Sequence, residues 1–263
     1  MELAPRTGQD VPLSPNPDTE LLPAHDVVVL DFETTGLSPA RGDRAIEIGA
    51  VRIIGGRITD HFAELMNPGM PVSSFITGLT GITNAMLSGA PPCGEVMARF
   101  SDYLGDSPVV AHNIRFDELF LEAELRRIHR WHDPPRACTM ECARRVITDA
   151  HNHRLGTLVQ HCCITNEGTF HRALADADMT ARLWILLLEN LKRQYDLDPV
   201  SFAFMQRLMK ANRKKPELFL ETERAARFAR DLARERGLEQ VPEGLETTRP
   251  GAPTGEVGPS PGC

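Results

Sequence analysis

The feature that most constrains the fold is an apolar, β-branched run near the N-terminus, VVVLDFE at residues 27–33. A continuous run of this kind is typical of a central strand that is buried on both faces of a sheet. Residues 45–54 then alternate apolar and polar positions, Gly55-Gly56 supplies a two-residue turn, and residues 57–65 return. These segments predict an antiparallel meander that contains a buried strand.

Helices and strands alternate in the rest of the chain. Residues 74–104 contain short helical segments interrupted by Gly and Pro, and residues 108–111 form another short strand. An α/β fold is therefore expected, with a mixed sheet flanked by helices. The helices predicted after that strand span residues 115–130, 141–147, 155–162, 173–195 and part of 198–236.

Proline and glycine, with 20 residues each, gather at the two ends of the chain. Residues 1–25 and 237–263 show no apolar periodicity, so they cannot bury enough surface to offset the entropy of ordering. We predict that both segments are disordered tails. Between them, we assign residues 26–195 to the main domain and residues 196–236 to a helical accessory arm, a C-terminal helical extension.

The distribution of charge limits the partners of the folded part. The formal net charge is −7, and subtracting −3 for each tail leaves −1 for the residues between them. Tight binding to a long duplex needs a strongly basic face, so a short stretch of nucleic acid is the expected ligand, with metal ions supplying positive charge. The sequence contains neither a signal peptide nor an apolar run of the ~20 residues needed to cross a bilayer, which predicts a cytoplasmic protein without membrane contact.

Two carboxylates mark the end of the first strand. Asp31 and Glu33 lie two residues apart, so their side chains point to the same face of the sheet. Hard divalent cations prefer oxygen ligands and neutralise acids that would otherwise repel each other. This pair therefore indicates a candidate cation site, although solvated acids are common at strand ends.

Three more candidates lie at the starts of helices. Asp117 falls in the first turn of the helix after residues 108–111, and His171 and Asp176 lie five residues apart at the entrance to the long helix 173–195. Asp178 is a competing acid, but residues two apart on a helix point about 200° apart, so Asp176 and Asp178 cannot both face one site. We expect Asp178 to be solvated.

The segments DFETTGL, LTGIT, AHNIRFDELFL and HRALADADMTARLW occur in this order and together resemble the DnaQ-like DEDDh family of 3′-to-5′ exonucleases, over residues 26–195. The resemblance implies a ribonuclease H-like fold and an active enzyme. It implies that two Mg²⁺ or Mn²⁺ ions are held by Asp31, Glu33, Asp117 and Asp176, and that His171 is the general base. It also implies contacts to the terminal nucleotide by Thr34, Thr35, Gly36, Leu37, Thr80, His112, Asn113 and Phe116.

The function expected from this resemblance is hydrolysis of phosphodiester bonds from 3′ ends, one 5′-mononucleotide at a time. Single-stranded DNA or frayed ends, in proofreading or repair, are the expected substrates. One open alternative is an exoribonuclease that trims RNA. Another is an interaction subunit that docks on a DNA polymerase through residues 198–236, where helical segments of mixed charge carry apolar side chains.

Overall fold

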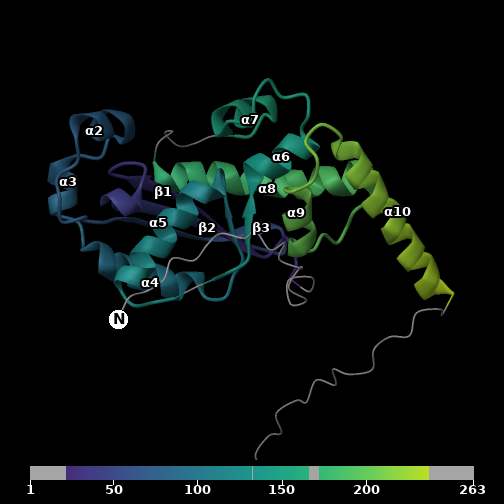
Figure 1. The fold of residues 1–263 in the computed structure, drawn as a ribbon, viewed down its shortest axis with the longest axis horizontal. Helices are drawn as coiled ribbons and strands as arrows, with labels where there is room; N and C mark the ends of the chain where they lie inside the picture. The colour runs from purple at the N-terminus through teal and green to yellow at the C-terminus, as the bar shows by residue number, and fades with distance from the viewer. Residues whose placement is uncertain (1–21, 132, 166–171, 237–263) are drawn as a thin grey trace, which may run out of the picture. The chain divides into compact units, whose positions relative to one another are not determined.

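The computed structural model describes residues 22–131, 133–165 and 172–236 (Figure 1). The predicted tails, apart from residues 22–25, lie outside the described residues, as does His171. The strands are β1 (Val27–Thr34), β2 (Ala45–Ile54), β3 (Arg57–Leu65), β4 (Val109–Ala111) and β5 (Arg136–Cys138). The helices are η1 (Pro39–Arg41), α2 (Ser74–Thr80), α3 (Asn84–Ser88), α4 (Cys93–Leu104), α5 (Ile114–Arg127), α6 (Thr139–Val146), α7 (Leu155–His161), α8 (Ala173–Tyr195), α9 (Phe202–Leu208) and α10 (Pro216–Glu235).

The strands form one mixed five-stranded sheet in the order β3-β2-β1-β4-β5. β2 pairs antiparallel with β1 and β3, which confirms the predicted meander, while β4 pairs parallel with β1 and β5 pairs parallel with β4. The predicted α/β fold with a mixed sheet is therefore confirmed. In this order the carboxyl ends of β1, β4 and β5 meet at one edge of the sheet, the usual place for a ligand in such folds.

Side chains of β1 alternate between two helical layers. Val28, Leu30 and Phe32 belong to a core cluster that includes side chains of α4 and α5. Val27 and Val29 belong to a second cluster that includes side chains of α6, α8 and α9. Because side chains two apart share a face of a strand, Asp31 and Glu33 lie on the face that α8 covers. The layers therefore fix which helix faces the two acids.

Gly49 of β2 allows α8 to cross the sheet closely. A Cβ added at Gly49 would overlap the backbone of Ala173 and Leu174 at the start of α8, so only glycine fits at this position. Gly49 is also the register partner of Asp31 in the β1–β2 pair. The close crossing consequently brings the first turn of α8, which carries Asp176, over the strand position of Asp31.

Residues 22–25 are hydrogen-bonded to α8 and to the start of α9. The indole Nε1 of Trp184 in α8 donates to the carbonyl of Ala24 at 2.8 Å, and the amide of Ala24 donates to the carbonyl of Val200 at 2.9 Å. Residues 22–25 thus pack against the core, although we assigned them to the tail, because so short a segment carries no apolar period. In α9, Phe202 and Met205 are fully buried in the core cluster that contains Val29 of β1.

The described residues fall into two compact units, one ending at Ala225 and the other beginning at Ala226. α10 begins in the first unit and ends in the second. In the ranges that the structure describes, none of the helices combines the length and the apolar run that crossing a bilayer would need.

Candidate active site

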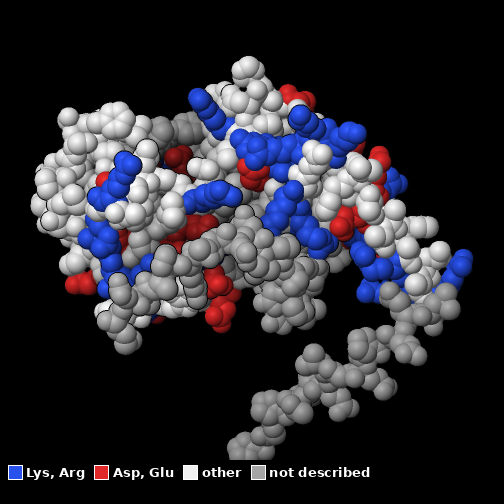
Figure 2. All heavy atoms as spheres, in the orientation of Figure 1, with Lys and Arg blue, Asp and Glu red and all other residues white. Residues whose placement is uncertain are grey.

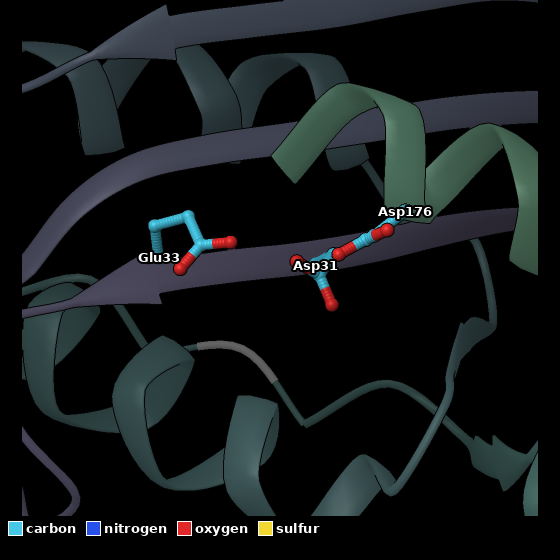
Figure 3. A group of neighbouring side chains, drawn as sticks. All are labelled: Asp31, Glu33 and Asp176. Carbon is cyan, nitrogen blue, oxygen red and sulfur yellow. The ribbon is translucent and has the colours of Figure 1, made fainter. Parts of the chain in front are cut away.

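Three carboxylates converge where β1 meets the start of α8 (Figure 3). Asp31 and Glu33 come from β1 and Asp176 from the first turn of α8, and a carboxylate oxygen of each lies within 4.8 Å of one from the others. Glu33 is only 9% exposed, so the group lies in a partly dry environment. Oxygen ligands this close together are the donor set that hard divalent cations prefer.

Asp117 joins this group from the opposite helical layer. Its Oδ1 accepts a hydrogen bond from the backbone amide of Phe32 at 3.2 Å, and Phe32 is the residue between Asp31 and Glu33. Asp117 is 2% exposed and lies in the first turn of α5. β4 is paired with β1 only at Val28 and Val29, which leaves the later part of β1 accessible to the start of α5. The four predicted metal ligands therefore meet around one end of β1.

Crowding and burial shift the pKa values of these acids upwards. Burial and the neighbouring charges of Asp117, Asp176, Glu33 and Glu47 hold the pKa of Asp31 well above its ordinary value. The pKa of Asp117 is also raised, mainly by burial, and burial together with the charges of Asp176 and Glu47 raises the pKa of Glu33 to about 7. So many acids cannot all ionise without a positive charge between them, and divalent cations would supply it. The residues present therefore fit a metal centre.

Glu33→Gln is expected to remove a pH-dependent loss of stability from the metal-free protein. The carboxyl of Glu33 has an ordinary pKa of 4.5 and a folded pKa of about 7, so the folded state binds more protons between these values. The free energy of unfolding therefore falls as pH rises through this window, by up to ~3 kcal/mol from this group. Urea unfolding in chelator at pH 4.5 and 7.5 should show a smaller fall in the variant. Equal falls in both proteins would contradict the assignment.

A fifth carboxylate, Glu47 of β2, anchors the start of α8. Glu47 pairs across the sheet with Glu33, and its side chain is buried. Its carboxylate accepts from the backbone amide of Ala173 at 3.0 Å and forms an ion pair with Arg172 at 2.7 Å. An acid at a helix N-terminus satisfies free amides and interacts favourably with the helix dipole. We did not identify Glu47 from the sequence, where it occupies the polar position of an alternating strand.

The loop after β1 is held by a second buried ion pair that we also did not identify. Arg44 forms a two-point contact with Glu124 of α5, at 2.7 Å from Nε and 2.9 Å from Nη2, and Glu124 is 2% exposed. The amide of Arg44 donates to the hydroxyl of Thr35 at 3.0 Å. This network fixes the loop next to the acids. In the sequence, Glu124 is one of two acids in the helical segment LFLEAEL at residues 119–125, and no local pattern separates it from Glu122.

The four predicted nucleotide contacts on this loop differ in exposure. Thr34 is buried and donates to the carbonyl of Gly36 at 2.6 Å, whereas Leu37 is 80% exposed. A Cβ at Gly36 would lie 2.5 Å from the carboxylate of Asp43, so a larger residue there would have to displace this side chain. The exposed Leu37 side chain is the apolar surface of this loop that is available to a base.

The other predicted contacts are distributed around α2 and α5. Thr80 is buried, and its hydroxyl donates to the carbonyl of Ile76 at 2.9 Å. Both ring nitrogens of His112 are occupied, Nδ1 by the Thr139 hydroxyl at 2.9 Å and Nε2 by the His153 carbonyl at 3.0 Å. Asn113 is exposed at the start of α5. Thr80 and His112 thus support the backbone around the site.

Phe116 and Asp178 complete the set of candidates in the described residues. Phe116 is partly buried against Phe120, with ring centroids 5.1 Å apart. Asp178 forms an ion pair with Arg182 at 2.6 Å and is not among the clustered acids, although its carboxylate also lies 3.8 Å from His61. Asp176 rather than Asp178 therefore faces β1.

Comparison with known proteins gives a consistent result. The family model described as "Exonuclease" matches residues 28–184, which include Asp31, Glu33, Asp117 and Asp176. DNA polymerase III PolC-type of Bacillus cereus is 38% identical over 183 residues. The alignment covers 69% of this chain but only 12% of that polymerase, so the chain corresponds to a small part of this relative.

Two solved structures show the same fold. Exonuclease X in complex with duplex DNA that has a 5′ overhang is 27% identical, with a TM-score of 0.52, and the match covers 68% of this chain and 98% of that one. The nuclease domain of 3′hExo, described as a DEDDh family member bound to rAMP, is 18% identical with a TM-score of 0.55. That match covers 63% of this chain and 92% of the other.

Proposed function

The chain belongs to the exonuclease family, and from this premise we propose that it is a DEDDh-type enzyme that hydrolyses nucleic-acid strands from their 3′ ends, releasing 5′-mononucleotides. The observation that carries the proposal is the convergence of Asp31, Glu33 and Asp176 within 4.8 Å, with Asp117 hydrogen-bonded beside them. Such a cluster on an exonuclease fold matches the need of phosphodiester hydrolysis for divalent cations.

In this proposal the four acids hold the cations and His171 is the general base. Two bound Mg²⁺ or Mn²⁺ ions would polarise the phosphoryl group, activate water and stabilise the leaving 3′-oxygen. Asp31 and Glu33 provide ligand oxygens from a rigid strand, while Asp117 and Asp176 provide them from opposite helical layers. His171 would take the proton of the attacking water, since its neutral imidazole is populated near pH 7.

Single-stranded DNA or a frayed DNA end is the substrate we propose. Exonuclease X, at 27% identity, is described in complex with duplex DNA carrying a 5′ overhang, which supports a DNA substrate here. An RNA-trimming activity is the competing possibility, and it would require contacts to the 2′-hydroxyl. Rates on DNA and RNA strands of one sequence would therefore decide between the two substrates.

The polarity of hydrolysis provides the test of the proposed function. A 5′-labelled strand should shorten stepwise from its 3′ end in Mg²⁺ or Mn²⁺, nucleoside 5′-monophosphates should appear, and chelator should stop the reaction. A strand with a blocked 3′ end should resist, and a closed circle should remain intact. Cleavage of the circle, or equal rates on blocked and unblocked strands, would overturn the proposal.

A contact with a DNA polymerase through residues 198–236 is a further part of the proposal. It is motivated by the PolC-type relative, of which this chain corresponds to 12%. In the first unit, Phe219 of α10 packs against Phe204 at a ring-centroid distance of 5.7 Å, whereas Leu218 is 63% exposed. Leu218→Glu should therefore reduce co-purification of a polymerase if this face is used.

A further inference from the structure

A cavity of about 460 Å³ is lined partly by residues that the exonuclease family model matches and partly by residues beyond that match. It is lined by three segments: the start of α5 (residues 113–115), the junction of β5 and α6 (residues 138–141), and the segment after α9 (residues 209–213). The last of these lies beyond residue 184, where the family match ends. The cavity is therefore a feature that this chain completes with its own C-terminal segment.

The cavity lies at the sheet edge that also carries the acids. Cys138 ends β5, which pairs parallel with β4, and β4 pairs parallel with β1. With neighbouring strands about 4.8 Å apart, Cys138 lies roughly 10 Å from β1 at the level of Leu30, the residue before Asp31. Ile114 lines the cavity three residues before Asp117 on the same helix. At ~3.4 Å of rise per nucleotide, the roughly 10 Å between Cys138 and β1 corresponds to two or three nucleotides.

Positive charge dominates the cavity lining. Arg115, Lys210 and Arg213 line it together with one acid, Glu141. The three basic side chains belong to exposed residues, and Figure 2 shows basic side chains on the visible face over α6 and α9. This local excess is notable because the chain between the two predicted tails has a net charge of only −1 when −3 for each tail is subtracted from −7.

Glu141 does not cancel this charge, because it is already shared among arginines. Its carboxylate pairs with Arg145 at 2.6 Å, with Arg213 at 2.7 Å and with Arg144 at 2.5 Å. Burial acts to raise the pKa of Glu141, but the hydrogen bond from Arg145 and the arginine charges lower it overall. Arg115 and Lys210 form no ion pair among those found in the described residues.

The segment that carries Lys210 is fixed in place. Arg145, which is only 4% exposed, donates to the carbonyl of Ala211 from Nε at 3.0 Å and from Nη2 at 2.6 Å. Gln206 of α9 donates to the carbonyl of Arg136 on β5 at 3.1 Å. Lys210 therefore projects from a backbone that is anchored to the sheet and to α6, which reduces the entropy lost when it binds an anion.

We propose that this cavity is a binding site for the sugar-phosphate backbone of the substrate strand, two or three nucleotides on the 5′ side of the scissile bond, with Arg115, Lys210 and Arg213 contacting phosphates. The inference rests on the proposed function, since it requires a strand whose 3′ end lies at the acids. Met140 and Met209 add apolar surface to the same cavity, which suits the sugar and base faces. Nonspecific grooves for single strands combine these two kinds of surface.

The test compares wild type with the double variant Arg115→Gln/Lys210→Gln, using oligothymidylates of two, four and eight nucleotides. Fluorescence anisotropy in chelator gives affinity without hydrolysis, and a salt series gives the number of phosphates contacted. Affinity of the wild type should rise with length, and the double variant should lose most of that gain. The slope of log K against log salt should fall by about 1.4, since each phosphate contact on a single strand contributes ~0.7.

Steady-state kinetics in Mg²⁺ provide the second readout. In the double variant, KM should rise more for the eight-nucleotide strand than for the dinucleotide. Arg57→Gln, on the β3 edge of the sheet, is the matched control and should behave as wild type. Equal length dependence and equal salt slopes in all three proteins would overturn this site and leave the exonuclease proposal intact. Failure of the wild type to hydrolyse any strand would instead contradict the proposed function.

Discussion

Replacing Asp31 with Asn is expected to lower the rate of strand hydrolysis by more than ~100-fold. Mutating a residue that only supports a metal ligand commonly costs about 10 to 100-fold in metal affinity or activity, and the loss of a ligand itself should cost more. Asp31 lies at the centre of the cluster: its pKa is raised by burial and by the charges of Asp117, Asp176, Glu33 and Glu47. The amide keeps the shape of the side chain and removes its negative charge. A gel assay with a 5′-labelled strand in saturating Mg²⁺ measures the effect.

The fold of Asp31→Asn should be retained, because the substitution relieves repulsion in the metal-free protein. Its melting temperature in chelator at pH 7.5 should equal or exceed that of wild type. Asp178→Asn is the matched control: this acid lies on the same helix as Asp176 but pairs with Arg182 at 2.6 Å. The control should keep near-normal activity. If Asp31→Asn were as active as Asp178→Asn, Asp31 would not be a metal ligand.

Replacing His171 with Ala is expected to lower turnover by ~10² to 10⁴-fold, the usual contribution of a general base, with a smaller effect on metal binding. The rate of the wild type should rise with pH as the imidazole of this histidine loses its proton, a step that an unperturbed histidine makes near pH 6.5. The variant should lose that inflection. Turnover measured between pH 5 and 9 in saturating Mn²⁺ tests both expectations.

The pH profile also separates His171 from the other histidine near the site. Burial lowers the pKa of His112 to about 4, and both of its ring nitrogens are engaged by Thr139 and His153. A reaction that used His112 as base would therefore show no inflection from that group between pH 5 and 9. Normal turnover in His171→Ala with an unchanged inflection would contradict the role of His171.

Long, patterned elements were predictable from the sequence because each carries its own period. The apolar run of residues 27–33 and the alternation of residues 45–65 predicted a meander, which the observed strands β1, β2 and β3 confirm. The helix α8 has the predicted bounds. β5 was not predicted, since it is three residues long, begins with Arg136 and is recognised as a strand through its parallel pairing with β4. A strand this short is defined by its neighbour rather than by its own residues.

The acids at the site were identifiable because their local motifs are distinctive, but the groups that position them were not. Glu47 and Glu124 look like ordinary polar positions of a strand and a helix, yet both are buried and bound to arginines, Arg172 and Arg44. Each pair joins residues about 80 or more positions apart, which no local period can reveal. The steric requirement at Gly49 likewise appears only once α8 is placed on β2.

Calorimetric titration with Mn²⁺ tests whether the clustered acids bind divalent cations. The titration compares the wild type, Asp31→Asn and Asp178→Asn at pH 7, in two buffers with different heats of ionisation. The raised pKa values of Asp31, Asp117 and Glu33 require these acids to lose protons when cations bind. We expect two ions to bind with proton release in the wild type and in Asp178→Asn, and binding to be strongly weakened in Asp31→Asn. Identical binding in all three proteins, or binding without proton release, would contradict it.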